Sequence, residues 1–438
     1  MDRFNVETLG PATIDSPITI MSSSKFVSQQ SRLLYKPFLS EVESCQKESR
    51  QPESFEIAGP TKKIYFPPPT TKAIIVTCGG LCPGINSVIR GLVMQLWYQY
   101  QVKNIVGVPY GYGGLAAKST ESFIPLNPDL VMNIHEQGGS FLGSSRGTPP
   151  TSEIVDSLQK SNANLLFVIG GDGTMKGALA ISKEIKKRGL KISIVGIPKT
   201  IDNDIPFVRR SFGFETAVSI ACQAAHSGHN EAKGTPNGIG LVKLMGRHSG
   251  YIAANTALAT GHANFCLIPE VDFSLEGSKG LLAQLEERIK ESDHTLIIVA
   301  EGAGQKYFAD GRGATDASGN KKLGDIGQYM KRRIVDHFKE KNITTSVKYI
   351  DPSYLIRSAA ANPADNLFCA NFAQNAVHGA MSGRTAFMVG YWHGKMTYVP
   401  LEAINGKNQQ IDQSGHLWFN VLQMTGQPQT IGDEASKD

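Results

Sequence analysis

The chain lacks any apolar run that approaches the ~20 residues needed to cross a membrane. It begins with a polar segment that has no hydrophobic core of a secretory signal. Cysteine is also scarce, with six scattered over 438 residues. That usage is typical of free thiols in a reducing compartment rather than of a disulfide framework. We therefore expect a cytoplasmic protein with no membrane partner.

A strong charge of one sign is missing as well. The chain has 44 Lys and Arg against 39 Asp and Glu, a net charge of +5. Its basic runs, 186–188 and 331–333, are short and typical of solvated helix faces, so we expect no nucleic-acid partner. The mild positive excess favours small anions such as phosphates. Neither the pair Cys78 and Cys82 nor the pair His226 and His229 is followed by further ligands at zinc spacing.

The length exceeds what one hydrophobic core usually serves, so we expect two or three domains. Residues 1–70 lack periodicity and end in prolines, which predicts an appended arm, partly ordered at best. From residue 72 onward short apolar runs alternate with helical patterns, which indicates an α/β fold with mostly parallel sheets. The expected strands are 72–77, 104–108, 164–169, 192–197, 239–244, 264–268, 295–300 and 386–389. The expected helices are 85–97, 152–159, 176–187, 215–232, 281–291 and 328–339.

Two glycine-rich segments follow expected strands, at 79–84 and 170–174. Ligands in α/β folds bind beyond the carboxyl ends of the strands, and glycines let backbone N–H groups approach a phosphate. The segment 138–147 is also rich in small residues and includes Arg146, whose guanidinium suits a phosphate. Packing glycines and a flexible surface loop are the alternatives for 79–84 and 138–147.

Three aspartates suggest chemistry. Asp172 lies among the glycines of 170–174, where a carboxylate beside phosphate-binding amides suits Mg²⁺. Asp202 and Asp204 are two residues apart, and in an extended segment they would point the same way. One would then accept a hydroxyl proton while the other helps to hold metal. Turn-forming aspartates are the alternative for all three. Farther on, Arg247 and Arg357 suit a sugar phosphate.

In order and spacing these motifs resemble the phosphofructokinases of glycolysis. The family shows GG-x-x-PG-x-N, GG-x-FLGSSR, GGDG[ST], P-[GK]-TIDND, MGR and a late Arg, and all occur here in that order. The resemblance covers about 72 to 400. It implies an allosteric, ATP-dependent 6-phosphofructokinase that phosphorylates the 1-hydroxyl of fructose 6-phosphate, with Mg²⁺ accompanying the ATP. GGDGT alone also occurs in NAD kinases and lipid kinases.

The resemblance also implies residue roles. Asp202 would be the general base, Thr200 would contact the transferring phosphoryl group, Asp172 would hold Mg²⁺, and Asp204 and Lys199 would support the reaction. The implied ATP-binding residues are Gly80, Tyr112, Arg146, Gly147, Gly171, Asp172, Gly173 and Thr174. The implied substrate-binding residues are Thr200, Ile201, Asp202, Met245, Gly246, Arg247, Glu301, Lys348, Tyr354 and Arg357.

Three positions differ from the compact bacterial pattern or indicate whether ATP or pyrophosphate is the phosphoryl donor. Gly238 stands where compact forms carry a phosphate-binding Arg from a neighbouring subunit, so Lys348 or Lys243 would have to replace it. Lys199 stands where those forms have Gly and is typical of a long-chain branch that includes pyrophosphate-dependent enzymes. Gly173 stands where pyrophosphate-dependent members usually carry Asp, which would crowd the α-phosphate. We expect ATP on this ground.

The expected fold is two Rossmann-like, three-layer α/β/α domains with mostly parallel sheets and an N-terminal extension, 1–71. We expect a nucleotide-binding domain at 72–212, with a segment returning near 356–400. A sugar-phosphate domain would span 213–355, with 401–438. Compact relatives complete their sugar site across subunits, which predicts a homotetramer. Two other functions stay open: a pyrophosphate-dependent enzyme of the same reaction, and a non-catalytic regulatory subunit that senses sugar phosphate. A dinucleotide-dependent oxidoreductase is disfavoured because no G-x-G-x-x-G with a ribose-binding acid follows the first strand.

Overall fold

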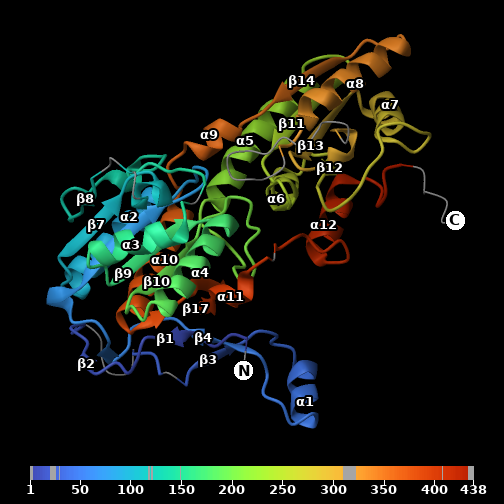
Figure 1. The fold of residues 1–438 in the computed structure, drawn as a ribbon. Coiled ribbons are helices and arrows are strands. Elements are labelled where there is room, and N and C mark those ends of the chain that lie inside the picture. Colours follow the sequence, from blue (N-terminus) through green and yellow to red (C-terminus); the bar gives the residue numbers. More distant parts are fainter. Residues whose placement is uncertain are drawn as a thin grey trace. The chain divides into compact units, whose positions relative to one another are not determined.

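A computed structural model describes residues 3–19, 26–28, 30–116, 119, 122–147, 149–308, 322–406 and 408–432 (Figure 1). The chain divides into two compact units. Unit 1 comprises 1–201, 205–213 and 358–408, and unit 2 comprises 202–204, 214–357 and 409–438. No helix in the described part of the chain is long and apolar enough to cross a membrane.

Unit 1 is built on a nine-stranded sheet. Its strands, in spatial order, are β3 (Arg32–Leu34), β4 (Ser54–Ile57), β17 (Lys395–Pro400), β16 (Phe387–Trp392), β10 (Ser193–Pro198), β9 (Leu165–Gly170), β6 (Lys72–Thr77), β7 (Asn104–Val108) and β8 (Ile124–Pro125). The five strands from β16 to β7 are parallel, and the outer strands are antiparallel. Two short antiparallel pairs stand apart: β1 (Glu7–Thr8) with β15 (Arg384–Thr385), and β2 (Ile14–Asp15) with β5 (Lys63–Ile64).

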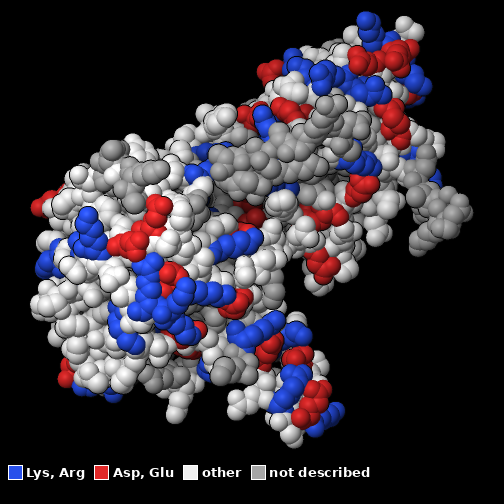
Figure 2. Space-filling model, viewed as in Figure 1, with Lys and Arg blue, Asp and Glu red and all other residues white. Residues whose placement is uncertain are grey.

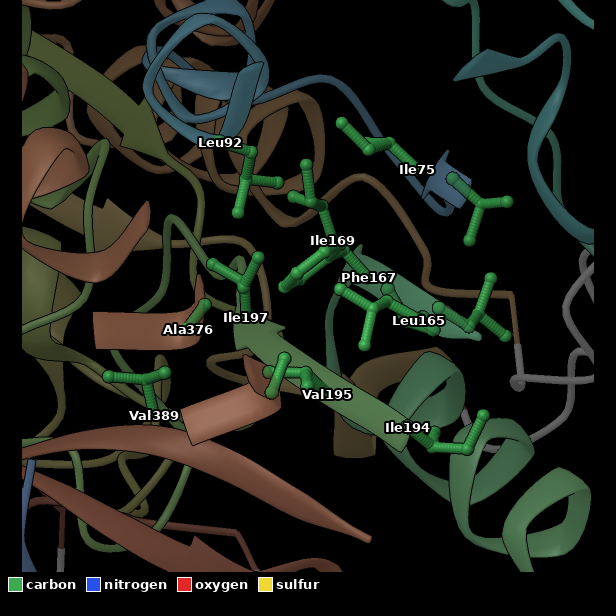
Figure 3. Close-up of a cluster of buried hydrophobic side chains, with 14 of the residues drawn as sticks. Ile75, Leu92, Leu165, Phe167, Ile169, Ile194, Val195, Ile197, Ala376 and Val389 are labelled. Carbon is green, nitrogen blue, oxygen red and sulfur yellow. The ribbon is translucent and has the colours of Figure 1, made fainter. Parts of the chain in front are cut away.

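The parallel strands are buried on both faces, which explains their continuous apolar runs. The helices of unit 1 are α1 (Leu39–Lys47), α2 (Ile85–Met94, continued by a π-helical turn at Gln95–Gln99), α3 (Thr151–Lys160), α4 (Asp172–Lys187), α10 (Pro363–Met381) and α11 (Leu401–Ile404). Helix α2 packs against α10, and α3 packs against α4 (Figure 1). Between helices and sheet lies a core of aliphatic side chains, such as Leu92, Ile169, Ile197 and Ala376 (Figure 3).

The N-terminal segment is more integrated than expected. Strand β4 pairs with β17, more than 330 residues away along the chain, and so extends the main sheet. Phe4 and Phe55 are fully buried in the unit 1 core, with ring centroids 4.3 Å apart. The expectation of a partly ordered arm is therefore wrong for most of its described residues. Helix α1 is the part that exposes apolar surface, at Phe38 and Leu39.

Unit 2 contains a four-stranded, wholly parallel sheet. Its strands, in spatial order, are β12 (Phe265–Leu267), β13 (His294–Ala300), β11 (Gly238–Leu244) and β14 (Ser346–Ile350). Its helices are α5 (Phe214–Lys233), α6 (Tyr251–Thr260), α7 (Leu281–Ser292), α8 (Ile326–Glu340), α9 (Ser353–Arg357) and α12 (His416–Thr425). Helix α5 packs on the sheet and against α6, whereas α7 and α8 cover the apolar core formed by β11, β12 and β13.

The expected α/β alternation is confirmed, and each predicted strand and helix overlaps an observed one. One boundary matters for the site: α4 begins at Asp172, four residues before the predicted start, so the glycine-rich segment 171–174 forms its first turn. The sequence pattern missed α6 and α10. Both helices carry apolar or small residues on most sides. The one-sided spacing that reveals an amphipathic helix is therefore absent from them.

The basic run 186–188 ends helix α4, where Lys and Arg side chains gather on the surface of unit 1 (Figure 2). Lys186 pairs with Glu7 at 3.0 Å, and Arg188 pairs with Asp156 and Glu184. Neighbouring carboxylates therefore offset much of this charge.

Candidate functional site

The glycine-rich segments of unit 1 meet at one point of the sheet. Strands β6 and β9 are neighbours, but the chain continues from β6 to β7 on one side and from β9 to β10 on the other. This reversal is the topological switch point where α/β sheets bind ligands, beyond the carboxyl ends of the strands. The pairing Thr77↔Ile169 brings the ends of β6 and β9 together. We call 79–80, 144–147, 171–174 and 199–200 the glycine-rich group.

Backbone contacts join these loops. The N–H of Gly79 donates to the carbonyl of Ser145 at 3.0 Å, and Ser144 Oγ donates to the carbonyl of Gly79 at 2.5 Å. A Cβ on Gly80 would lie 3.8 Å from Nη2 of Arg146, so the guanidinium lies close to that backbone. Gly147 follows with φ +90°, a conformation that favours glycine. The structure thus brings together Gly80, Arg146 and Gly147 as the resemblance implied.

Asp172 and Thr174 lie in the first turn of α4, which starts directly after Gly171. The first N–H groups of a helix have no partner within the helix, and the helix dipole favours an anion there. The carboxylate of Asp172 pairs with Lys176 Nζ at 2.6 Å. A Cβ at Gly171 would make ordinary van der Waals contact, at 3.4 Å, with the carbonyl oxygen of Lys199.

Gly173 differs from its neighbours. A Cβ at this position would meet nothing within 4 Å, and its backbone is not in the left-handed region. The protein itself could therefore accept a side chain at this position. The open space lies beside the helix N-terminus, where an anion would bind.

Lys199 links two loops of the glycine-rich group. It is 6% exposed, its N–H donates to the carbonyl of Gly170 at 2.9 Å, and its ammonium donates to the carbonyl of Gly80 at 2.6 Å. The next residue, Thr200, accepts a hydrogen bond at its carbonyl from Ser211 Oγ at 2.5 Å. A buried ammonium here supplies positive charge next to the phosphate-type turns.

Tyr112 does not lie where an adenine contact requires it. Its side chain is 1% exposed, and its hydroxyl donates to the carbonyl of Thr174 at 3.0 Å. Tyr112 therefore supports the first turn of α4 instead of making the expected direct contact to adenine. The exposed aromatic of this segment is Tyr110, which is 53% exposed and packs over Gly143. Its left-handed backbone, φ +55°, is a signal that only the structure reveals.

Asp172 is the carboxylate on which the expected Mg²⁺ site depends. Among the residues that the structure describes, no three His, Cys, Asp or Glu side chains are grouped to hold a metal ion. Mg²⁺ is usually held through one or two carboxylates plus substrate phosphates. The single carboxylate of Asp172, at a phosphate-type helix N-terminus, fits that mode of binding.

A second set of residues gathers in unit 2, and we call it the carboxylate group: 202–204, 245–247, 301 and 357. The pairing Leu244↔Ala300 places the ends of β11 and β13 side by side. The N–H of Gly302 donates to the carbonyl of Gly246 at 3.0 Å, and the N–H of Glu301 donates to the carbonyl of Leu244 at 2.8 Å. These contacts bring Gly246 and Glu301 together at the carboxyl edge of this sheet.

Asp202 has a strongly shifted pKa. Burial raises its pKa to about 7, and the nearby carboxylates of Asp204 and Glu301 act in the same direction. The backbone N–H of Arg247 and the positive charge of Arg357 oppose the shift. A carboxylate with a pKa near 7 is matched to general-base catalysis at neutral pH.

Asp202 and Asp204 do not owe their closeness to an extended segment, as the sequence had led us to expect. The segment is not extended, because Asn203 between them has φ +55°, in the left-handed region. The carboxylates nevertheless lie close enough for Asp204 to raise the pKa of Asp202. Asn tolerates this backbone conformation better than most residues, since its short polar side chain can bond locally.

Met245 and Arg357 are in contact, with Arg357 Nε donating to Met245 Sδ at 3.3 Å. Met245 is buried, and Gly246 has φ +127°. Tyr354 lies one helical turn before Arg357 on the short helix α9 and is 85% exposed. The exposed ring of Tyr354 can contact a ligand.

Lys348 is not part of the carboxylate group. It pairs in mid-sheet with Gly240 of β11, four residues before the strand end, about 13 Å along the strand. Its ammonium lies 3.7 Å from the carboxylate of Glu231 on α5. Within its own chain Lys348 thus lies away from the carboxylate group. Its role in substrate binding, which the resemblance implied, stays a prediction.

Lys243 and Gly238 are the other two positions that bear on the missing phosphate-binding arginine. Lys243 Nζ lies 2.8 Å from Asp351 and 3.4 Å from Asp325. Burial opposes the charge of Lys243, but these carboxylates outweigh it and raise its pKa. At Gly238 a Cβ would lie 2.0 Å from the carbonyl oxygen of Ala232, so no arginine fits there. Carboxylates of the same chain thus compensate Lys243, and Lys348 remains the candidate for the cation that replaces that arginine.

The histidines noted in the sequence belong to a larger cluster. His229 stacks on His262 with centroids 4.3 Å apart, and His226 and His294 contact the same pair edge-on. Burial lowers the pKa of His229, and the neighbouring His262 adds to that effect. This stack of rings is a packing arrangement, and it lies outside the carboxylate group.

The comparisons with known proteins agree with this geometry. The family model of phosphofructokinase matches residues 72–380. An ATP-dependent 6-phosphofructokinase of Borreliella burgdorferi is 48% identical over 97% of both chains. One from Amycolatopsis methanolica is 44% identical over all of this chain and 98% of its own length. ATP-dependent 6-phosphofructokinase 7 of Arabidopsis thaliana is 47% identical over 88% of this chain and 79% of its own.

Solved structures show the same fold at lower identity. A pyrophosphate-dependent phosphofructokinase of Marinobacter aquaeolei superposes with a TM-score of 0.66 at 19% identity, over 83% of this chain and 92% of that one. Phosphofructokinase of Pichia pastoris in the T-state superposes with a TM-score of 0.62 at 20% identity, over 81% of this chain and 37% of that one. Because the family model matches most of the chain and relatives are 44–48% identical over most of it, this chain belongs to the phosphofructokinase family.

Proposed function

We propose that this chain is an ATP-dependent 6-phosphofructokinase, which transfers the γ-phosphoryl group of ATP to the 1-hydroxyl of fructose 6-phosphate. The single observation that carries the proposal is Asp202, a buried carboxyl with a pKa of about 7 that lies near the basic residues Arg247 and Arg357. A base matched to neutral pH next to phosphate-binding cations suits transfer to the hydroxyl of a sugar phosphate. The relatives at 44–48% identity carry the same name.

In the carboxylate group, Asp202 accepts the proton of the 1-hydroxyl as the oxygen attacks phosphorus. Arg247 and Arg357 hold the 6-phosphate with charge-assisted hydrogen bonds. Glu301 is placed to accept hydrogen bonds from sugar hydroxyls, and Met245 and Gly246 line the sugar. Tyr354 extends this surface. Asp204 keeps the pKa of Asp202 high through its own negative charge.

In the glycine-rich group, the backbone N–H groups of Gly80 and of the first turn of α4 bind the phosphates of ATP. Arg146 and Gly147 contribute a guanidinium and a close backbone approach. Lys199 adds a buried charge, and Thr200 contacts the transferring phosphoryl group. Asp172 would hold Mg²⁺, which neutralises charge on the phosphates when bound. Tyr110 supplies an exposed ring on which a base could stack.

Gly173 supports ATP as the donor. The open space at its Cβ position leaves room for an α-phosphate that an aspartate would crowd and repel. Lys199 is compatible with either donor, because it adds attraction for any phosphate. The pyrophosphate-dependent structures share only the fold at 19% identity and carry no argument on the donor.

A homotetramer, a cytoplasmic location and the domain limits given above remain predictions. The residue roles given for the carboxylate group and the glycine-rich group are likewise part of the proposal.

The test is a set of initial rates with fructose 6-phosphate, using ATP or pyrophosphate as donor, with and without AMP. Formation of fructose 1,6-bisphosphate is followed by coupling to aldolase. We expect turnover with ATP that needs Mg²⁺ and is at least tenfold faster than with pyrophosphate. Faster turnover with pyrophosphate would assign the pyrophosphate-dependent reaction. No turnover with either donor, despite binding of fructose 6-phosphate, would favour the regulatory subunit.

A further inference from the structure

A short segment of irregular backbone touches both catalytic loops of unit 2. We call residues 409–413 the strap. The N–H of Gln409 donates to the carbonyl of Asp204 at 2.7 Å, next to the proposed base. Gln410 Nε2 donates to the carbonyl of His248 at 3.0 Å, one residue after Arg247. The strap therefore contacts the loop of the base and the loop of the phosphate clamp within two consecutive residues.

Two further side chains hold the strap. The hydroxyl of Tyr251, at the start of α6, donates to the carbonyl of Gln410 at 2.8 Å. The side chain of Ile411 is 4% exposed and fixes the strap in the interior of the unit. Since the strap belongs to no helix or strand, its backbone depends on such partners for its hydrogen bonds.

Glu270 is the anchor between the strap and the clamp loop. One carboxylate oxygen, Oε1, accepts from the N–H of Ile411 at 2.9 Å and from the N–H of Gly250 at 3.0 Å. The backbone carbonyl of Glu270 accepts from Gln413 Nε2. A single residue thus joins the middle and the last residue of the strap to Gly250, three residues after Arg247.

The two loops are also coupled to each other. The backbone N–H of Arg247 bonds the carboxylate of Asp202, and Ser249 Oγ donates to the carbonyl of Asp202 at 2.9 Å. Both loops contain left-handed or glycine-dependent backbone, at Asn203 and Gly246. Loops of this kind keep their geometry only when their surroundings hold them. A shift of about 1 Å in such a site can cost about 100-fold in rate.

We propose that Glu270 and the strap position the base Asp202 and the clamp Arg247 relative to each other, so that Glu270 acts as a positioning residue of the reaction. This inference rests on the proposed function of the carboxylate group. Glu270 contributes as a double hydrogen-bond acceptor, and its negative charge is not needed. The burial that raises its pKa agrees with a carboxyl placed for its acceptor geometry.

The test compares five variants with wild type in steady-state kinetics. Glu270→Ala removes both acceptor bonds, and Glu270→Gln keeps a carbonyl oxygen in their place. Tyr251→Phe removes one bond of the strap with little change in volume, and Gln410→Ala removes another from an exposed side chain. Ser414→Ala is the matched control, because its hydroxyl bonds only within the turn to Asp412 among the contacts of the described residues.

We expect Glu270→Ala to lower kcat at least tenfold and to raise the KM for fructose 6-phosphate, with the KM for ATP changed less than twofold. Glu270→Gln should restore kcat to within threefold of wild type. Tyr251→Phe and Gln410→Ala should raise the KM for fructose 6-phosphate several-fold, and Ser414→Ala should match wild type. Wild-type kinetics in Glu270→Ala, Tyr251→Phe and Gln410→Ala alike would overturn the proposal. So would a Glu270→Gln variant as impaired as Glu270→Ala.

Hydrogen exchange gives a readout that does not depend on activity. In Glu270→Ala, the amides of Gln409, Ile411 and Arg247 should exchange at least tenfold faster than in wild type, while amides of β13 should stay protected. Unchanged exchange at these three amides would overturn the positioning role, even if activity fell. A wild type inactive with both donors would instead refute the proposed function, and the exchange data would still decide whether the strap holds the loops.

Discussion

The backbone N–H of Arg247 donates a hydrogen bond to the carboxylate of Asp202. These residues lie 45 positions apart in the sequence, and each follows a different strand. The proposed base and the loop of the proposed phosphate clamp therefore form one structural element. A substitution in one of them is therefore expected to alter the geometry of the other.

Asp202→Asn should reduce kcat by roughly 10²- to 10⁴-fold, because the amide cannot accept the proton of the 1-hydroxyl. The KM for fructose 6-phosphate should change much less. The variant keeps an oxygen that can accept from Arg247 N–H. Steady-state kinetics measure both constants, and a kcat within a few-fold of wild type would remove Asp202 from the role of base.

The pH dependence follows from the raised pKa of Asp202. The base must be ionised, so kcat of the wild type should fall as the pH drops through about 7. Folding favours the protonated form, because the folded pKa of about 7 exceeds the ordinary 3.8. Wild-type stability should thus decrease as the pH rises from about 4 to 7 through this group. Asp202→Asn should have a higher Tm than wild type at pH 8, and that difference should vanish at pH 4. Calorimetry at both values tests the sign.

Arg247→Ala and Arg357→Ala should each raise the KM for fructose 6-phosphate by about 10- to 100-fold, since each removes charge-assisted bonds to the phosphate. Because of its link to Asp202, the Arg247 variant should also lose some kcat. Arg333→Ala is the control, because its guanidinium pairs with Glu276 at the surface and lies outside the carboxylate group, so both constants should stay unchanged. If either arginine variant changed only the KM for ATP, that arginine would belong to the ATP site and not to the sugar-phosphate site.

Gly173→Asp should depress turnover with ATP by at least 100-fold while the protein keeps its wild-type Tm. The protein has space for the side chain, so only the α-phosphate should meet it, through crowding and like-charge repulsion. Pyrophosphate lacks that phosphate, and a trace of activity with it can remain. Gly173→Ala is a smaller, uncharged control. ATP kinetics unchanged in Gly173→Asp would refute the steric argument.

Lys199→Gly should weaken phosphoryl transfer from ATP without abolishing ATP binding. It removes a buried positive charge and also the 2.6 Å hydrogen bond to the carbonyl of Gly80. Lys199→Arg separates the two effects, because it keeps the charge but changes the geometry. The kcat and the ATP affinity, measured by calorimetric titration, report on them separately. If wild-type turnover is faster with pyrophosphate than with ATP, Lys199 is the better guide to the donor than Gly173.

The assembly prediction concerns the whole chain. Compact relatives complete their sugar site across a subunit interface, so we expect a homotetramer, or at least a dimer. Gly238 leaves no room for the side chain that compact forms use at that interface, so another residue would have to take its place. Light scattering at assay concentration decides this, and a fully active monomer would rule out a shared site.

The sequence by itself determined the α/β class, the order of the motifs and the family. Those features are local: an apolar run followed by glycines marks a strand end, and residues 79–80 and 171–174 lie where that pattern predicts. It also predicted roles for Asp202, Arg247 and Arg357, because short motifs carry them.

Only the tertiary structure decided the features that depend on partners far away in the chain. The register of β14 against β11 places Lys348 opposite Gly240 in mid-sheet, and burial makes Tyr112 a support of α4. The pairing of β4 with β17 and the contact of Gln409 with Asp204 leave no local pattern either. Hydrogen bonds between distant segments depend on where the chain returns, and the shift in the pKa of Asp202 depends on which charges surround it after that return.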